Sequence, residues 1–207
     1  MIKKFANPLL IACAVVICAS SFIFSKEIAS VYKVDTAQSS VKWIGKKVTG
    51  EHTGNVTVSG GSLSTTKNAI TAGTVEIDLS TITSTDITDP TSNAKLIGHL
   101  KSADFFNVAS FPKATLVITS SKLKSAGVYD VTGNLTIKGI TQPITFPATI
   151  QTTADKINAT AAITIDRTKY DIKYRSASFF SDLGDKAIDN NFVLNVKLVA
   201  NKSNEKL

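Results

Sequence analysis

The stretch Val128-Tyr-Asp-Val-Thr-Gly-Asn-Leu-Thr-Ile-Lys138 decides the fold class, because apolar and polar side chains alternate along it. Its polar residues occupy the even positions from Asp130 onward, and its odd positions carry Tyr129, Val131, Gly133, Leu135 and Ile137. Because side chains of a β-strand alternate between its two faces, one face here is apolar and the other meets water. We therefore expect an antiparallel strand with a single buried face.

Strand-like runs of the same kind follow one another along the chain. Glycine-containing turn signals accompany them, as at Gly60-Gly61 within one run and Lys138-Gly139 after another. The complete set of runs is Tyr32–Asp35, Ser39–Lys47, Thr53–Ser64, Ile70–Leu79, Ala114–Leu123, Val128–Lys138, Ile144–Thr153, Lys156–Arg167 and Asn191–Ala200. Eight or nine antiparallel strands with one apolar face each predict an all-β domain, either a barrel or a sandwich.

One compact block, Gly98–Thr115, does not alternate. Just before and within it, Ala94, Leu96 or Ile97, and Leu100 fall at helical spacing, and an aromatic pair, Phe105-Phe106, follows. This spacing predicts one short helix around residues 91–106. We expect the helix to close or flank one end of the barrel with its aromatic pair packed inward, or to pack on the sheet as ordinary core.

The N-terminus is typical of an exported protein. Two lysines follow Met1-Ile2, and an almost unbroken apolar run extends over Pro8–Phe24. We predict a secretory signal peptide over residues 1–25, an uncleaved anchor being the alternative. A further alternative is lipidation at Cys13, because Leu10-Ile-Ala-Cys13 resembles a bacterial lipobox. Both cysteines, Cys13 and Cys18, lie in this segment, so the mature chain would fold without disulfides.

The charge pattern argues against a nucleic-acid ligand. The formal net charge is +7, but lysines and acidic residues are interspersed along the strands without a basic run. Aromatic residues make up only 7% of the chain and form no girdles, which argues against a transmembrane barrel. We expect a soluble protein with no nucleic-acid partner.

The residues that could support catalysis or metal binding are few. The chain has two histidines, His52 and His99, with no second ligand at metal-binding spacing. Asp86, Asp89 and Asp104 stand where aspartate commonly caps a helix or forms a turn. We therefore expect no enzyme activity, no metal and no cofactor. An envelope hydrolase would require His99 to meet an acid and a nucleophile in one pocket.

Five segments together resemble the YceI-like family of bacterial envelope proteins. They are Tyr32–Asp35, Ser39–Trp43, Gly98–Phe106, Phe111–Thr115 and Val131–Ile144, and the resemblance extends over residues 31–200. It implies an extended eight-stranded antiparallel barrel, similar to that of lipocalins, around an apolar pore. It further implies export to the periplasm and binding of a polyisoprenoid chain, either an isoprenoid quinone or a prenyl pyrophosphate, without an established enzymatic activity. Residues 201–207 would form a polar C-terminal tail.

The alternating apolar positions then become candidate pore-lining residues. They are Trp43, Val56, Val58, Val75, Ile77, Phe105, Phe106, Val131, Leu135, Ile137, Ile144, Phe146, Ala159, Ala161, Ile163, Phe192, Leu194 and Val196. Candidates for binding a polar head group are Lys101, Arg167, Lys169 and Arg175. Small residues such as Ala159 and Ala161 either leave a cavity or fit the taper of a filled barrel, and the sequence leaves both open.

The function predicted from these residues is binding, sequestration or transport of an amphiphilic isoprenoid lipid in the bacterial envelope. The expected partner is an isoprenoid lipid or quinone, and contact with a membrane surface and a homodimer are further hypotheses. The alternative is a ligand-free interaction module of the envelope, similar to a β-sandwich and with a filled core.

Overall fold

The computed structural model describes residues 29–67 and 69–203. The predicted signal peptide, with Cys13 and Cys18, lies outside the described residues, as do residues 204–207 of the predicted tail.

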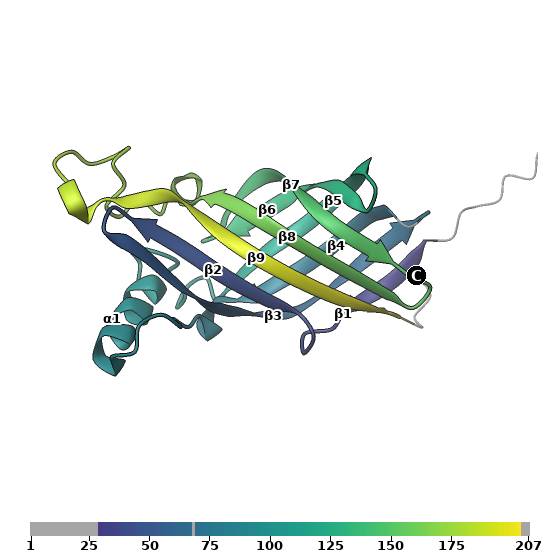
Figure 1. Cartoon of the computed structure of the whole chain (residues 1–207), viewed down its shortest axis with the longest axis horizontal. Coiled ribbons are helices and arrows are strands. Elements are labelled where there is room, and N and C mark those ends of the chain that lie inside the picture. Colours follow the sequence, from purple (N-terminus) through teal and green to yellow (C-terminus); the bar gives the residue numbers. More distant parts are fainter. Residues whose placement is uncertain (1–28, 68, 204–207) are drawn as a thin grey trace, which may run out of the picture.

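In the described part of the chain, one antiparallel sheet of nine strands closes on itself (Figure 1). The strands are β1 (Ser30–Val34), β2 (Ser40–Lys47), β3 (Gly50–Thr66), β4 (Ala69–Asp78), β5 (Lys113–Ser125), β6 (Val128–Ile137), β7 (Ile140–Thr152), β8 (Lys156–Asp166) and β9 (Ile188–Lys202). The helices are α1 (Pro90–Lys101) and three short 3₁₀ turns, η1 (Leu79–Thr81), η2 (Arg167–Tyr170) and η3 (Gly184–Lys186). Each predicted strand overlaps one of these, and the all-β fold class is confirmed.

The nine strands occupy eight positions around the barrel. β1 and β2 both pair with β3 on one side and with β9 on the other, so they share one position end to end. From there the order runs through β9, β8, β7, β6, β5 and β4, and β4 pairs with β3 to close the barrel. The eight-stranded antiparallel barrel expected from the resemblance is therefore confirmed.

The barrel is filled at the end where β1 lies. Tyr32 is 3% exposed, and Leu63, Ile157 and Ala200 are completely buried around it. These residues are neighbours across the ladder, because Tyr32 pairs with Leu63 and Ile157 pairs with Ala200. The Tyr32 hydroxyl donates to the carbonyl oxygen of Thr153 at 3.0 Å. Close packing leaves no passage into the barrel at this end.

α1 lies at the opposite end of the barrel (Figure 1). It begins at an N-cap, Asp89, whose carboxylate accepts from the Ser92 N–H at 2.8 Å, and Pro90 occupies the first turn. No helix among the described residues is long and apolar enough to cross a membrane.

The prediction of a helix around residues 91–106 was wrong in its last turn, because α1 ends at Lys101. The Ser102 hydroxyl donates to the His99 carbonyl oxygen at 2.8 Å and competes with helix continuation. The chain then folds back, and the Phe106 N–H donates to the Leu100 carbonyl oxygen at 3.1 Å. This turn places Phe105 in the core, where it is 8% exposed.

The segment after η1 covers the part of β3 that β4 does not pair. Thr83 N–H donates to the Asn55 carbonyl oxygen at 2.9 Å, and Thr85 N–H donates to that of Thr53 at 2.8 Å. The indole N–H of Trp43 donates to the Thr83 carbonyl oxygen at 2.9 Å. Gly54, which pairs with Trp43 across the ladder, makes this close approach possible. A Cβ at Gly54 would lie 1.7 Å from the Thr83 oxygen.

Gly54→Ala should therefore lower the free energy of unfolding by about 1–3 kcal/mol, because the segment carrying Thr83 must move away. Urea unfolding measures the change. The matched control is Gly60→Ala on the same strand, where no atom lies within 4 Å of the added Cβ. Equal stability of the two variants would contradict the close contact at Thr83.

Candidate functional site

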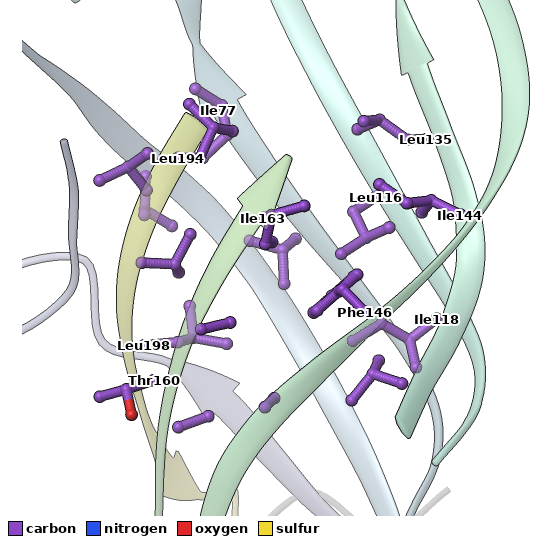
Figure 2. A pocket seen from close by; sticks show the side chains of 18 of the residues that line it. Ile77, Leu116, Ile118, Leu135, Ile144, Phe146, Thr160, Ile163, Leu194 and Leu198 are labelled. Atoms are coloured by element: carbon purple, nitrogen blue, oxygen red, sulfur yellow. The ribbon is translucent and has the colours of Figure 1, made fainter. Parts of the chain in front are cut away.

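A cavity with about 870 Å³ of atom-free space, including open solvent at its mouth, occupies the middle of the barrel (Figure 2). Its lining comes from the inward faces of the strands, as Leu116, Ile144, Ile163 and Leu194 show in Figure 2. Among the described residues that line it, Thr160 alone has a polar side chain. The wall is therefore almost purely hydrocarbon.

A second cavity, with about 930 Å³ of atom-free space including open solvent at its mouth, lies toward the α1 end and adjoins the first. Six residues line both: Val41, Ile77, Ala114, Leu135, Ile165 and Leu194. Phe105 and Phe106 line the second cavity together with Leu100 of α1. The two cavities therefore adjoin at a shared waist, and together we call them the lumen; the turn after α1 forms part of the wall at its far end.

The structure places all of the candidate pore-lining residues on this lumen. The first cavity is lined by Val58, Val75, Ile77, Val131, Leu135, Ile144, Phe146, Ala159, Ala161, Ile163, Leu194 and Val196. The second cavity is lined by Trp43, Val56, Phe105, Phe106, Ile137 and Phe192. That these residues contact a ligand stays a prediction. Ala159 and Ala161 line open space, so the small inward residues leave a cavity.

The second cavity also has polar lining residues, and Arg167 is the one that is buried. It is 4% exposed, and its guanidinium donates to the carbonyl oxygens of Ile172 at 2.7 Å, Asp189 at 2.9 Å and Ile188 at 3.0 Å. Among the described carboxylates, none forms an ion pair with it. A guanidinium has more N–H donors than these three contacts use, so it can donate further into the cavity.

Burial lowers the pKa of Arg167, and the nearby carboxylates of Asp166 and Asp189 oppose this effect. The ordinary value is so high that the group stays positively charged. The Phe105 ring lies 5.9 Å from the guanidinium carbon, which adds a cation–π contact. The lumen thus ends in a buried positive charge that is bound only by neutral groups.

The other three head-group candidates lie outside the lining of both cavities. Lys101 donates to the Ser80 carbonyl oxygen at 2.7 Å. The guanidinium of Arg175, an exposed residue, lies 5.1 Å from the Tyr174 ring. Lys169 is exposed after β8. Lys46, by contrast, does line the second cavity, and the pairing of β2 with β9 shifts register between Gly45 and Lys47. The alternation pattern carries no sign of such an irregularity.

Both histidines pair with aspartates, away from the cavities. His52 Nδ1 lies 2.7 Å from an Asp86 carboxylate oxygen, and His99 Nε2 lies 3.4 Å from one of Asp104. None of these four residues lines either cavity. The His99 ring packs edge-on against Phe105 and Tyr174, with ring centroids 4.9 and 4.5 Å apart. His99 therefore packs against the turn that carries Phe105. Because neither histidine lines a cavity, the cavities give no support to the hydrolase hypothesis.

Several residues of the lumen were missed as site residues. Ala114, Leu116 and Ile118 line it from β5, and their alternation could have revealed them. Leu79, Ile82 and Ile172 line it from turns, where period two does not apply. Within the described residues, no three His, Cys, Asp or Glu side chains converge to form a metal site.

A family model described as the YceI-like domain matches residues 32–200. The chain belongs to the YceI-like family. Over 65 residues it is 46% identical to the protein YceI of Salmonella arizonae and to that of Salmonella newport. These matches cover 31% of this chain and 34% of each relative, so the matched segment spans about a third of the curated relatives' length.

Two solved structures share the fold. One is a polyisoprenoid binding domain from Saccharophagus degradans implicated in plant cell wall breakdown, with a TM-score of 0.60 and 16% identity over 83% of this chain and 98% of that one. The other is BcnA of Burkholderia cenocepacia, with a TM-score of 0.57 and 20% identity over 80% of this chain and 98% of that one.

The free energy of unfolding at acidic pH should depend on the protonation of Asp86. Its partial burial opposes ionisation, but hydrogen bonds from His52, the Thr53 N–H and Ser84 lower its pKa to about 2 from 3.8. Because the folded-state pKa is depressed, the carboxylate stabilises the fold fully above pH 3.8, and this stabilisation is lost as the pH falls from 3.8 to about 2.

Asp86→Asn should therefore be less stable than the parent protein at pH 6, and the difference should shrink between pH 4 and pH 2. Urea unfolding across this range measures it. Other depressed carboxylates, such as Asp35 and Asp78, titrate equally in both proteins and cancel in the difference. A difference that does not change with pH would contradict the assignment to Asp86.

Proposed function

We propose that this YceI-like protein binds an isoprenoid lipid and holds its apolar tail in the lumen of the barrel. The observation that carries the proposal is a pair of adjoining, largely hydrocarbon-lined cavities, the second of which is also lined by one buried cation, Arg167. Transfer of a hydrocarbon chain from water into such a lumen contributes about 0.8 kcal/mol for each CH₂-sized unit. A site of this kind needs no specific polar contact along the tail.

The form of the lumen supports a long, narrow tail rather than a compact ligand. Its two cavities meet end to end at the waist around Ala114 and Leu135. Packing around Tyr32 and Leu63 blocks the β1 end. A flexible chain that enters the lumen can therefore extend from the middle of the barrel to Arg167.

The head group would lie at Arg167. An anionic diphosphate would add charge-assisted hydrogen bonds to this guanidinium, and a quinone would accept a hydrogen bond through a carbonyl oxygen. Lys46 and Asn191 line the same cavity and offer further donors. The similarity to a polyisoprenoid binding domain supports the tail chemistry.

We further propose that the protein acts in the bacterial envelope. The support is the charged start and the apolar run over Pro8–Phe24. N-terminal sequencing of the protein from a periplasmic fraction tests removal of residues 1–25, and a lipid on Cys13 would support membrane anchoring instead. Homodimer formation and contact with a membrane surface stay predictions.

The alternative of a sandwich-like interaction module is wrong in its structural part. That hypothesis requires two sheets around a filled core, whereas one sheet closes on itself around two cavities. The reason lies in the small inward residues, such as Ala114, Ala148 and Ala159, which leave the interior open.

Ala114→Leu should weaken binding of geranylgeraniol at least about tenfold, because added methyl groups narrow the waist of the lumen. Titration of the fluorescence of Trp43, the only tryptophan of the chain, measures the affinity. The control is Ala72→Leu, an exposed position on β4 that lines neither cavity. Unchanged affinity of the Ala114 variant would place the tail elsewhere.

Arg167→Met should remove the preference between head groups. The parent protein should bind geranylgeranyl diphosphate more tightly than geranylgeraniol by about tenfold or more, and the variant should bind both equally. The ratio of the two affinities is the measurement, because partial unfolding of the variant lowers both together. A ratio near one in the parent protein, with tight binding of an isoprenoid quinone, would identify the quinone as the ligand. An unchanged ratio in the variant would exclude Arg167 as the head-group contact.

A further inference from the structure

The seam between β7 and β8 is open over most of its length. Their pairing covers only Thr149–Thr152 on β7 and Ile157–Thr160 on β8. Both strands are otherwise regular, since β7 pairs with β6 from Ile140 to Thr149 and β8 pairs with β9 throughout. Figure 2 shows the two ribbons diverging from the level of Thr160 toward Ile163 and Ile144. The ladder between β7 and β8 is thus interrupted on the wall of the lumen.

Two prolines on β7 prevent this gap from closing. Ile150 N–H donates to the Gly127 carbonyl oxygen at 2.9 Å, so the N–H groups at even positions of β7 point toward β6. Those at odd positions therefore point toward β8. Pro143 and Pro147 are odd and have no N–H to donate. Proline within a sheet is characteristic of an edge strand. Between Pro143 and Pro147, Thr145 alone has a backbone N–H that points toward β8.

A groove on the outside of the barrel lies over the start of the gap. Its lining includes Pro147 and Thr149 of β7 and the run Thr160-Ala161-Ala162 of β8. Thr160 and Ala161 also line the first cavity, and so does Val196 of β9. Groove and lumen therefore adjoin across a wall one residue thick.

Thr160 stands where the outer groove, the lumen and the start of the gap meet. On β8 the inward residues are odd, and Ile157, Ile163 and Ile165 are all buried. Thr160 is even and exposed, yet it lines the first cavity. Thr160 is also the last residue of β8 that pairs with β7, so the gap begins directly beside it.

We propose that the open seam between β7 and β8 is a lateral port through which the apolar tail of the bound lipid enters and leaves the lumen. This inference rests on the proposed lipid-binding function. Packing closes the β1 end, and at the α1 end Phe105 and Phe106 line the second cavity together with the exposed residues Lys46 and Asn191. The seam admits a chain sideways along its length, so a long tail need not thread lengthwise through an end of the barrel. Ala161 and Ala162 keep the port free of large side chains.

The port predicts a kinetic effect without a change in affinity. Ala162→Phe places a ring in the outer groove, away from the lumen, so loading and release should both slow by about tenfold while the dissociation constant stays the same. The matched control is Asn158→Phe, which lies on the outer face of β8 where the ladder is intact. Both variants keep Trp43 as the only tryptophan.

A second variant should close the port by extending the backbone ladder between β7 and β8. Pro143→Thr with Pro147→Thr restores two N–H donors opposite β8, so the ladder should extend and loading should slow in the same way. Hydrogen exchange at residues 143, 145 and 147 reports whether the ladder has formed. The control is Pro112→Thr, in the segment before β5. The Pro112 carbonyl oxygen accepts a hydrogen bond from the Leu79 N–H, and this bond does not depend on the proline ring.

Stopped-flow quenching of Trp43 by a benzoquinone with a short isoprenoid tail measures loading, and dilution into lipid vesicles measures release. Slower rates with an unchanged dissociation constant in Ala162→Phe support the port. Parent-like rates in Ala162→Phe, and in the proline double variant once its ladder has formed, overturn it and direct attention to the α1 end. Absence of binding in the parent protein would instead overturn the proposed function, so the two failures are distinguishable.

Discussion

The structure depends on closure of one antiparallel ladder around eight positions. Closure makes every second residue of each strand face a single interior, whatever its size. Where those residues are large, as Tyr32 and Leu63 are, the interior is solid. Where alanines stand among them, as at Ala114, Ala148 and Ala159, the same geometry leaves a lumen. The hollow middle of the barrel is therefore a consequence of the volume of its inward-facing residues.

The two ends of the lumen differ in polarity for a local reason. Its middle is lined by strand residues, whose alternation sends polar side chains outward. Toward α1 the strands end, and three backbone carbonyl groups face Arg167: that of Ile172, which follows η2, and those of Ile188 and Asp189 at the start of β9. Arg167 satisfies these carbonyls and introduces a positive charge that the described carboxylates do not neutralise by an ion pair. An amphiphile with an apolar tail and an electron-rich head matches this gradient.

The alternation predicted much of the fold and the lumen from sequence alone. All candidate pore-lining residues lie on one or other cavity, because period two is a geometric property of strands and survives in tertiary structure. The prediction failed where the chain leaves that geometry. The helix ended earlier than its apolar spacing suggested, since Ser102 bonds back to His99. Among the four cations proposed for a head group, only Arg167 lines the lumen, because turn residues have no periodic facing.

The sequence by itself determined that the strands are antiparallel, in which order they follow along the chain, and which face of each strand is apolar. These properties follow from the alternation of residue types with period two. Only the tertiary structure decided that the interior is hollow, that Arg167 is buried and that β7 and β8 separate beyond Thr160. Each of these depends on which strands are neighbours across the barrel. Pro143 and Pro147 illustrate the difference: the sequence shows two prolines, but their missing donors acquire meaning only once the ladder shows that both point toward β8.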